Sequence, residues 1–365
     1  MSVRKTRSKR VTLRDVARKS GFSPSTVSIV LSDAPLSRYV APETKERIRK
    51  AAQELGYRPD VFARSLRSRR SNTIGVLLFD ISDPYCVLVL RGIDQTLRGT
   101  AWLPILVDAH NDPARFESYI DLFIERCAEG VIVVANWLFD EAGKLAKIQE
   151  ENVPVVVVGR DLSARGIRSV LVDNEAGGYE AVRHLYELGH RRIAIIRGPR
   201  QLDDSVRRWE GVERFASESG WRIDARLVRD LTVTDDPMSP FDGGMRVTAG
   251  LIDGGEPFTA LLAFDDFTAL GALRALHQAG LSVPNDCSVL GFDDMPQAAL
   301  STPALSTIRQ PMEEMGAVAA QWVLRALSEK GEAHPTVERF SPVLVVRDSS
   351  TTIVTEQPTL AEAGK

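Results

Sequence analysis

Hydrophobic residues follow two different patterns in this chain, one before and one after about residue 70. Between residues 12 and 55, apolar side chains recur at spacings of three and four positions. From Thr73 onward, continuous apolar runs of strand length alternate with amphipathic stretches of helix length. The first pattern is typical of short amphipathic helices, and the second of parallel strands that helices cover on both faces. The sequence therefore predicts an all-α N-terminal headpiece followed by a doubly wound, parallel-sheet α/β body.

Three short helices are predicted in the headpiece. Thr12 and Asp15 have the spacing of a capping pair, and Gly21 breaks the chain after the first helix. Ser23 is a candidate N-cap with Pro24 at the first helical position. Two helices joined by a tight turn and braced by a third form the helix-turn-helix arrangement that places one helix in the major groove of DNA. The apolar positions that the helices bury are Leu13, Val16 and Ala17, then Val27, Val30 and Leu31, and then Ile48, Ala51, Ala52 and Leu55.

The headpiece is strongly basic, although the whole chain carries a net charge of only −3. Eighteen of the first 70 residues are Lys or Arg and six are Asp or Glu, which gives this stretch a charge of about +12. Clustered Lys and Arg bind polyanions because they displace the counterions condensed on phosphates. The segment 11–58 is therefore predicted to bind double-stranded DNA, whereas a trihelical protein-binding module would have no need of the charge. Residues 1–10 are predicted to be a disordered basic tail.

Two series of strand-like runs are predicted in the body. Its length exceeds that of one typical α/β domain, so we expect two lobes with a ligand cleft between them. The first series is TIGVLLF, LPILV, GVIVVA and VPVVVVG, and the second is SVLVD, RIAII, FTALLAF and CSVLGF.

These motifs occur in the order found in a known family. The run TLRDVARKSGFSPSTVSIVLSD, followed by ETKERIRKAAQELGYRPDVFARSLRSRRSNTIGVLL, resembles the DNA-binding head and hinge of the LacI/GalR (lactose repressor/galactose repressor) family of bacterial transcription regulators. The resemblance extends over almost the whole chain. It implies that the second helix reads base edges and that DNA is contacted by Thr12, Leu13, Pro24, Ser25, Thr26, Ser28 and Ile29.

The headpiece departs from the family pattern in three places. Ile29 stands where Arg is usual, and an Ile side chain can contact a thymine methyl group but cannot form the forked hydrogen bonds of Arg to guanine. The loop between residues 32 and 41 is a few residues longer than usual, and Ala41 stands where a Ser cap is common. We therefore expect a different operator preference and an altered angle of the third helix.

A short hinge helix is expected at residues 59–70. The segment from Val61 to Arg67 forms too few hydrogen bonds to be stable alone in water, so it should fold only on DNA. The resemblance implies that Leu66 and its copy in a second subunit wedge into the minor groove, with Arg64 and Arg67 near phosphates. The alternative is that Leu66 packs on the body.

The resemblance also implies a two-lobed, periplasmic-binding-protein-like core whose chain crosses three times between the lobes. The N-terminal lobe is expected at 73–172 and 305–339, and the C-terminal lobe at 173–304 and 340–350, including the late strand PVLVVRD. A homodimer is expected, with helices near the first strand in its contact. The tail 351–365 has no regular pattern and is predicted to be disordered.

Polar residues directly after the predicted strands are the candidates for effector binding, because ligands of open parallel sheets meet the carboxyl ends of strands. Carboxylates and amides suit the hydroxyls of a sugar or another small polyol, and Arg would suit a carboxylate or phosphate on it. Asp265 stands where the family often has Asn. Asp83, Asp266 and Asp294 are expected to be caps or turn formers. The candidate effector-binding residues are Asp80, Tyr85, Asn136, Arg160, Arg208, Asp265, Asp293 and Gln310.

Other function classes have weaker support. The Asp pairs could hold Mg²⁺ in a metal-dependent enzyme, but the chain has no G-x-x-x-x-G-K-[ST], G-x-S-x-G or H-E-x-x-H motif and its five histidines are scattered. A secreted solute-binding protein would share the body, but no apolar leader or membrane-length apolar run is present. Three cysteines, an odd number, are consistent with reduced thiols. We therefore expect no catalytic residue, metal or cofactor, no membrane partner, and a cytoplasmic location.

The sequence thus predicts a dimeric repressor that binds a palindromic operator and is switched by a small effector in the cleft. Effector binding is expected to change the relative pose of the lobes and so to permit or prevent packing of the hinge helices. The alternative is control by a protein corepressor in place of a small molecule.

Overall fold

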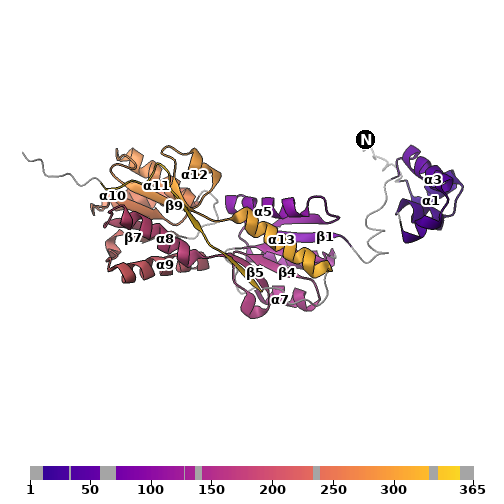
Figure 1. Cartoon of the computed structure of the whole chain (residues 1–365), viewed down its shortest axis with the longest axis horizontal. Coiled ribbons are helices and arrows are strands. Elements are labelled where there is room, and N and C mark those ends of the chain that lie inside the picture. Colours follow the sequence, from indigo (N-terminus) through magenta and orange to yellow (C-terminus); the bar gives the residue numbers. More distant parts are fainter. Residues whose placement is uncertain are drawn as a thin grey trace, which may run out of the picture. The chain divides into compact units, whose positions relative to one another are not determined.

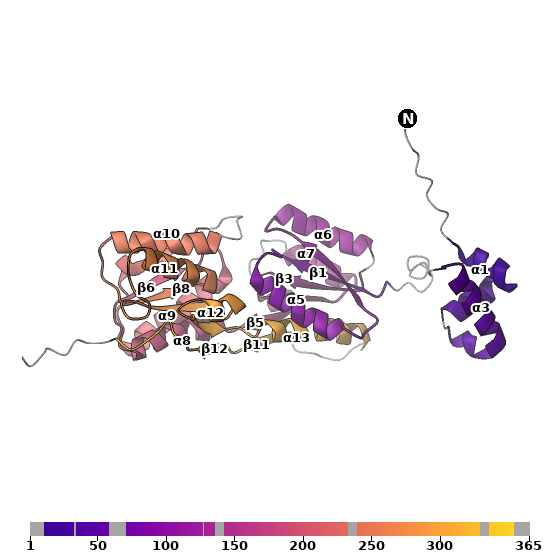
Figure 2. The same cartoon turned by 90° about the horizontal axis from the view of Figure 1, so that it is seen from above.

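The computed structural model describes residues 11–32, 34–57, 71–126, 128–135, 142–232, 239–328 and 336–353. Residues Met1–Ser71 and Asn72–Lys365 form two compact units, drawn in Figures 1 and 2. Several predictions fall on residues outside the described ranges: the basic tail 1–10, the hinge residues Arg64, Leu66 and Arg67, and the candidate effector residue Asn136.

The described part of the first unit contains the three predicted helices. Thr12 accepts a hydrogen bond from the Asp15 backbone N–H, and the Asp15 carboxylate accepts one from the Thr12 N–H, which completes a capping box. Gly21 has a φ of 80°, a left-handed conformation that ends the first helix. Ser23 caps the second helix by accepting from the Thr26 N–H. The elements are α1 Leu13–Ser20, α2 Pro24–Leu31, the 3₁₀ helix η1 Pro35–Tyr39, and α3 Pro42–Glu54.

These helices enclose a small apolar core. Arg47 of α3 fastens its edge: its Nη2 donates to the Ser20 carbonyl oxygen at 3.2 Å, and its guanidinium lies 5.1 Å from the centre of the Phe22 ring. The core positions agree with those predicted from the spacing, with Leu13, Leu31 and Leu55 partly buried at the margin. The buried side chains are Val16, Ala17, Val27, Val30, Ile48, Ala51 and Ala52.

The N-terminal lobe of the second unit is a parallel sheet with strand order β11-β5-β4-β3-β1-β2. Strands β3 and β4 are buried along their whole length, as the continuous apolar runs predict. The strands are β1 Thr73–Leu78, β2 Leu103–Asp108, β3 Gly130–Val134, β4 Val155–Val158, β5 Arg168–Val172 and β11 Val337–Phe340. One face is covered by α5 Pro84–Leu97 and α13 Met312–Ser328, and the other by α6 Pro113–Glu125 and α7 Ala142–Glu150.

The C-terminal lobe repeats this arrangement with strand order β12-β10-β9-β8-β6-β7, in which only β12 runs antiparallel among the described strands. The strands are β6 Ile193–Arg197, β7 Val228–Asp230, β8 Ala260–Ala263, β9 Ser288–Asp293, β10 Ser306–Arg309 and β12 Val343–Val345. Figure 2 shows the covering helices: α8 Asn174–Glu187 and α9 Asp203–Ser219 on one face, and α10 Ser239–Asp253 and α11 Asp266–Gln278 on the other, with the short α12 Pro296–Leu300 after β9.

The chain crosses between the lobes after β5, after β10 and between β11 and β12. The expected boundary at residue 305 is wrong, because β10 pairs with β9 and β12 and therefore belongs to the C-terminal lobe. A short apolar run fits either sheet, and only its pairing decides which one it joins. Strand β11 also ends at Phe340 in the N-terminal lobe, one residue beyond the expected limit.

The first residues of the expected disordered tail are instead bonded to the C-terminal lobe. The Thr351 N–H donates to Ser288 Oγ at 3.1 Å, and the Ile353 N–H donates to the Leu188 carbonyl oxygen at 3.0 Å. These backbone bonds order a segment that carries no periodic pattern. None of the described helices combines the length and hydropathy needed to cross a lipid bilayer.

Candidate DNA interface and effector site

Helix α2 presents one face to solvent because Val27 and Val30 point into the headpiece core. The predicted base-reading residues share that outward face. Pro24 and Ser25 are exposed, and Thr26, Ser28 and Ile29 are half-buried.

The N-terminus of α1 is the second part of the candidate DNA interface. Thr12 is exposed, while the Leu13 side chain is half-buried against the core. Backbone N–H groups at a helix N-terminus attract anions such as phosphate. A DNA contact at Leu13 therefore relies on the backbone more than on its side chain.

The cations of the headpiece divide into two groups. Lys19 Nζ lies 2.7 Å from Glu54 Oε2, and Arg47 bonds to the Ser20 carbonyl, so both hold helices together. The Arg18 side chain is 82% exposed and lies 3.7 Å from Asp15. Lys19 and Arg47 therefore stabilise the packing of the helices, whereas Arg18 is exposed to solvent.

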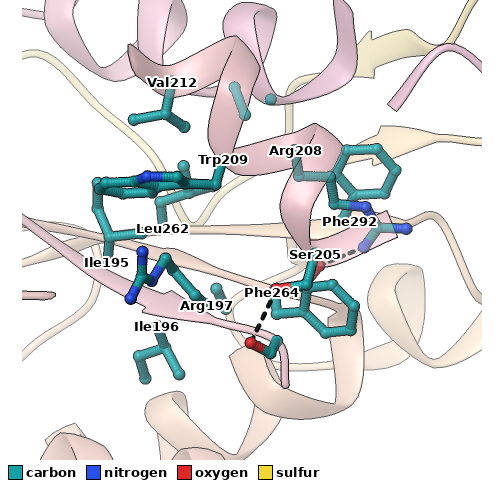
Figure 3. Close-up of a pocket in the computed structure, with 14 residues that line it drawn as sticks. Ile195, Ile196, Arg197, Ser205, Arg208, Trp209, Val212, Leu262, Phe264 and Phe292 are labelled. Carbon is teal, nitrogen blue, oxygen red and sulfur yellow. Dashed lines mark hydrogen bonds between the residues drawn. The ribbon is translucent and has the colours of Figure 1, made fainter. Parts of the chain in front are cut away.

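Arg208 on α9 is the centre of the candidate effector site, and Figure 3 shows its side chain beside Phe292, at the edge of a pocket inside the C-terminal lobe. It is 9% exposed, and its guanidinium carbon lies 3.6 Å from the centre of the Phe292 ring and 4.6 Å from that of Phe264. Nε donates to Asn174 Oδ1 at 2.9 Å, and Nη1 donates to the Phe264 carbonyl oxygen at 2.5 Å. Nη2 lies 3.5 Å from Asp293 Oδ1. The guanidinium is thus fixed in position and paired with a carboxylate.

Close packing of α8 against α9 places Arg208. A Cβ atom at Gly178 would lie 2.0 Å from the Arg208 carbonyl oxygen, so a side chain at this position would force the two helices apart. One turn before Arg208, Asp204 Oδ1 accepts a hydrogen bond from Asn174 Nδ2 at 2.9 Å. Burial raises the pKa of Asp204 to about 6, although the Arg208 charge acts to lower it.

Asp293 and Gln310 link the site to a crossover between the lobes. Asp293 ends β9 with a φ of 115°, a conformation that non-glycine residues rarely adopt. Its Oδ1 accepts a hydrogen bond from Gln310 Nε2 at 2.5 Å. Gln310 is 6% exposed and directly follows β10. Burial raises the pKa of Asp293, and the Arg208 guanidinium opposes this change.

Asp265 and Asp266 have roles that differ from those expected. Asp265 is the N-cap of α11, because its Oδ1 accepts from the Thr268 N–H at 2.7 Å. Asp266, the expected cap, instead accepts from Thr307 Oγ1 at 2.6 Å and from the Met295 N–H at 2.8 Å. Asp266 thereby ties α11 to β10, and burial raises its pKa to about 7. Burial also raises the pKa of Asp265, while the Thr268 hydrogen bonds and Arg208 act to lower it.

The N-terminal lobe contributes residues that follow β1. Asp83 caps α5 as predicted, accepting from the Tyr85 N–H at 2.8 Å, and burial raises its pKa to about 7. Asp80 is 3% exposed and accepts from the Ser82 N–H at 2.8 Å and from its hydroxyl at 2.5 Å. Burial raises the pKa of Tyr85, and the charge of Asp204 in the other lobe raises it further. The Tyr85 hydroxyl therefore experiences carboxylates of both lobes.

A cavity of about 290 Å³ lies between the lobes, and its lining includes Asn174, which bonds to Arg208, and Asp204. This volume is near the lower end for small-molecule pockets, roughly 300–1,000 Å³. Arg160 directly follows the first residue of the lining, Gly159, and its charge acts to lower the pKa of Asp204. The charged residues of the lining are Asp161, Asp173, Glu175, Asp203, Asp204, Arg207 and Arg339.

Asp294 has a structural role, in agreement with the prediction that it is not a ligand contact. Its Oδ2 lies 2.6 Å from Arg309 Nε, and its Oδ1 lies 2.5 Å from Arg347 Nη2. The side chain is 8% exposed. This pair of ion contacts joins the ends of β9, β10 and β12.

A group of potential metal ligands lies at the end of β1 and β2. Oxygen and nitrogen atoms of Asp80, Asp108 and His110 lie within 4.8 Å of one another. Asp108 Oδ1 also accepts from the Ile81 N–H at 3.3 Å and from the His110 N–H at 2.9 Å. Together with the hydrogen bonds that Ser82 donates to Asp80, these contacts fix the loops that follow β1 and β2.

The predicted effector residues therefore meet only in part. Arg208, Asp293 and Gln310 form one connected group, and its charges influence the pKa of Asp265 and, from the other lobe, the pKa of Tyr85. Asn136 lies outside the described residues. The partners that hold Arg208 were not predicted from the sequence. Asn174 lies two residues after the end of β5, and Asp204 precedes Arg208 by one helical turn. The missed residues are Asn174, Asp204, Phe264 and Phe292.

Two family models match the chain. Residues 12–60 match the model described as bacterial regulatory proteins, lacI family, and residues 182–350 match a periplasmic binding protein-like domain. The HTH-type transcriptional repressor PurR of Erwinia tasmaniensis is 31% identical, over 93% of this chain and 96% of that protein.

Solved structures with the same fold include regulators bound to DNA and to a sugar. The lac repressor dimer bound to operator and the anti-inducer ONPF has a TM-score of 0.83 and 26% identity, over 94% of this chain and 100% of that one. The complex of the transcriptional regulator CelR with cellobiose has a TM-score of 0.68 and 28% identity, over 93% and 100%.

These relatives are transcription regulators and not enzymes, so the metal-dependent enzyme considered above is set aside. The confirmed features are the helix-turn-helix headpiece and the two parallel-sheet lobes. They agree with the family models at both ends of the chain. The chain therefore belongs to the lacI family of bacterial regulatory proteins.

Proposed function

We propose that this protein is a transcriptional repressor that binds a palindromic operator as a homodimer. A small hydroxylated effector, a sugar or sugar derivative, binds between the lobes and controls it. The observation that carries this proposal is the connected group of Arg208, Asp293 and Gln310, which joins polar groups at strand ends to a crossover between the lobes.

DNA binding is assigned to the headpiece. Helix α2 enters the major groove with Ser25 and Ile29 toward base edges, and the N-terminus of α1 meets a phosphate. The exposure of this face and the charge of about +12 over the first 70 residues support the assignment. In the hinge, Leu66 wedges into the minor groove, with Arg64 and Arg67 near phosphates.

Exposed apolar side chains support the homodimer. Val87 on α5 is 47% exposed, Leu103 on the edge strand β2 is 64% exposed, and Leu300 at the end of α12 is 81% exposed. Such side chains favour subunit contacts when they form a contiguous surface. A two-fold symmetric dimer would present two headpieces to two half-sites of an operator.

Effector control is assigned to the site around Arg208. Asn174 and Asp204, which adjoin Arg208, line a cavity together with further carboxylates, and such groups suit several hydroxyls at once. The cellobiose complex of CelR is a relative of the same fold with a sugar bound. Because the group includes Gln310 at a crossover, occupancy of the site shifts the preferred pose of the lobes. The pose then permits or prevents packing of the hinge helices.

The experiment that tests this function begins with selection of duplex sequences bound by the full chain. We expect selected palindromes to bind at least about a hundredfold tighter than random duplex at fixed salt. Leu66→Ala should weaken binding to the selected operator and leave effector binding intact. Val346→Ala, at an exposed apolar position in the body, is the matched control. Equal, weak binding to random and selected duplexes at every salt concentration would refute the proposal.

A further inference from the structure

Carboxylates outnumber guanidinium groups in the lining of the cavity between the lobes. The carboxylates of the described lining belong to Asp161, Asp173, Glu175, Asp203 and Asp204, whereas the guanidinium groups belong to Arg207 and Arg339. Asp204 accepts a hydrogen bond from Asn174, which also accepts one from Arg208, so the cavity adjoins the candidate effector arginine.

The arginines of this region already face carboxylates. Arg208 Nη2 lies 3.5 Å from Asp293, and its other two nitrogens donate to Asn174 and to the Phe264 carbonyl oxygen. Arg207 forms ion pairs with Asp203 at 3.9 Å and with Glu210 at 3.0 Å. Arg339 lies 3.5 Å from Asp161, and the charge of Arg160 acts to lower the pKa of Asp204.

A bound anion would therefore meet compensated cations and additional carboxylates. Bringing a phosphate or carboxylate into such a site costs its hydration and adds repulsion, and both effects are large where water is excluded. Hydroxyl and ammonium groups instead donate hydrogen bonds to the carboxylate oxygens. The unused N–H groups of the Arg208 guanidinium can still donate to a hydroxyl oxygen.

We propose that the effector of this repressor carries no negative charge: it is a neutral or amine-bearing polyol, and the site rejects phosphorylated and carboxylated sugars. This inference rests on the proposed function and narrows its ligand class. Asp204 is the residue that sets the preference, because it lines the cavity and accepts a hydrogen bond from Asn174, which holds Arg208.

The protonation of the cavity supplies an independent measurement. Burial raises the pKa of Asp204, which lines the cavity, to about 6, so this carboxyl group holds part of a proton near neutral pH. An ammonium group bound beside it favours its ionised form and releases protons to the buffer. A phosphate would have the opposite effect and take protons up.

The test compares matched sets of probes on the full chain. Each set contains a parent sugar, its amine and its phosphate: glucose, glucosamine and glucose 6-phosphate, then galactose, galactosamine and galactose 6-phosphate. Thermal-shift screening is followed by calorimetry in buffers of different ionisation enthalpy. In any set that binds, we expect the parent or amine to bind at least about tenfold tighter than the phosphate, with proton release for the amine.

Two outcomes would overturn the inference: a phosphate that binds as tightly as its parent, or proton uptake when an amine binds. Operator affinity is measured separately with the same ligands. If a phosphorylated sugar binds best and also changes operator affinity, the repressor function stands while the charge preference fails. If ligands bind with the expected preference and operator affinity does not respond, the ligand-controlled function fails.

Asp204→Asn provides the variant test. The Asn side chain can still accept the hydrogen bond from Asn174, so the contact between α8 and α9 is kept while one negative charge at the cavity is lost. We expect discrimination against the phosphate to fall by about tenfold. Asp253→Asn, at an exposed position near the end of α10, is the matched control and should leave discrimination unchanged. Undiminished discrimination in Asp204→Asn would remove Asp204 from this role.

Discussion

Gln310 Nε2 donates a hydrogen bond to Asp293 Oδ1 at 2.5 Å, and the same oxygen lies 3.5 Å from Arg208 Nη2. The end of β9, the crossover after β10 and the candidate effector arginine therefore share one carboxylate oxygen. A ligand that attracts Arg208 or Asp293 changes the bond that Gln310 can make. This contact is a direct physical link between the occupied site and the segment that connects the lobes.

Gln310→Ala is expected to uncouple effector binding from DNA binding. The substitution removes the donor to Asp293 but leaves Arg208 and its partners in place, so effector affinity should change by only a few-fold. The change in operator affinity on effector binding should shrink by about fivefold or more, within the usual range of coupling free energies. Fluorescence anisotropy with labelled operator measures both quantities.

Gln297→Ala, at an exposed position on α12, is the control for this variant. Full effector response in Gln310→Ala would show that the crossover does not carry the coupling. Loss of effector binding itself would place Gln310 in the ligand contact set.

Arg208→Ala is expected to abolish effector response without reducing operator affinity in the absence of effector. The substitution leaves Asp293 and Asn174 without their guanidinium partner, and breaking a buried pair costs about 3–5 kcal/mol in the free energy of unfolding. Arg208→Lys keeps the charge but not the planar fork, so it should fold better and still bind effector weakly. Arg214→Ala, on the exposed side of the same helix, serves as the control.

Calorimetry and chemical denaturation separate the two roles of Arg208. If Arg208→Lys folds normally and binds effector with undiminished affinity, the guanidinium is structural only.

The sequence was most informative where local chemistry determines structure. The capping residues Thr12 and Ser23 and the buried face of α2 follow from neighbours within four positions, and all were confirmed. The partners of Arg208 could not be predicted, because Asn174 reaches it across the α8–α9 contact and Phe264 follows β8, 56 residues further along the chain. Such contacts depend on how helices pack on the sheet.

The errors have a similar origin. Strand β10 was expected in the N-terminal lobe but pairs with β9 of the C-terminal lobe. The sequence of a short apolar run does not indicate which of two sheets the strand joins. Asp266 was expected to be a cap or turn former and Asp265 to contact the effector, yet Asp265 is the cap of α11. The direction of each side chain at a helix start depends on the backbone that leaves the strand. In both cases the sequence identified the strand or the carboxylates, but not the groups to which they are hydrogen-bonded.

Stability of the ligand-free protein should fall as pH rises from about 5 to 8. Burial raises the pKa of Asp83 to about 7, of Asp204 to about 6 and of Asp266 to about 7, above the ordinary value of 3.8. The folded state therefore holds more protons than the unfolded state. The resulting stabilisation is fully present below about pH 4 and is lost as pH rises through 6 and 7.

Thermal unfolding across this pH range measures the effect, about 1–3 kcal/mol for each group that titrates. Asp204→Asn can still accept the hydrogen bond from Asn174 and should flatten the dependence. Asp253→Asn should leave the slope unchanged. A stability that rises steadily from pH 5 to 8 would contradict the buried protonation.

Ile29→Arg is expected to change which operator sequence the headpiece prefers. Ile29 is half-buried on the outward face of α2, where its side chain offers an apolar contact suited to a thymine methyl group. An Arg at this position can donate two hydrogen bonds to guanine, and such a contact discriminates between bases by about 1–3 kcal/mol. Parallel selection from a random duplex library should therefore show guanine enriched at one position of each half-site, by about tenfold or more. Gln53→Arg adds the same charge on α3 and should raise overall affinity without a new base preference. If both variants select the operator of the unmodified protein, residue 29 does not read the DNA sequence.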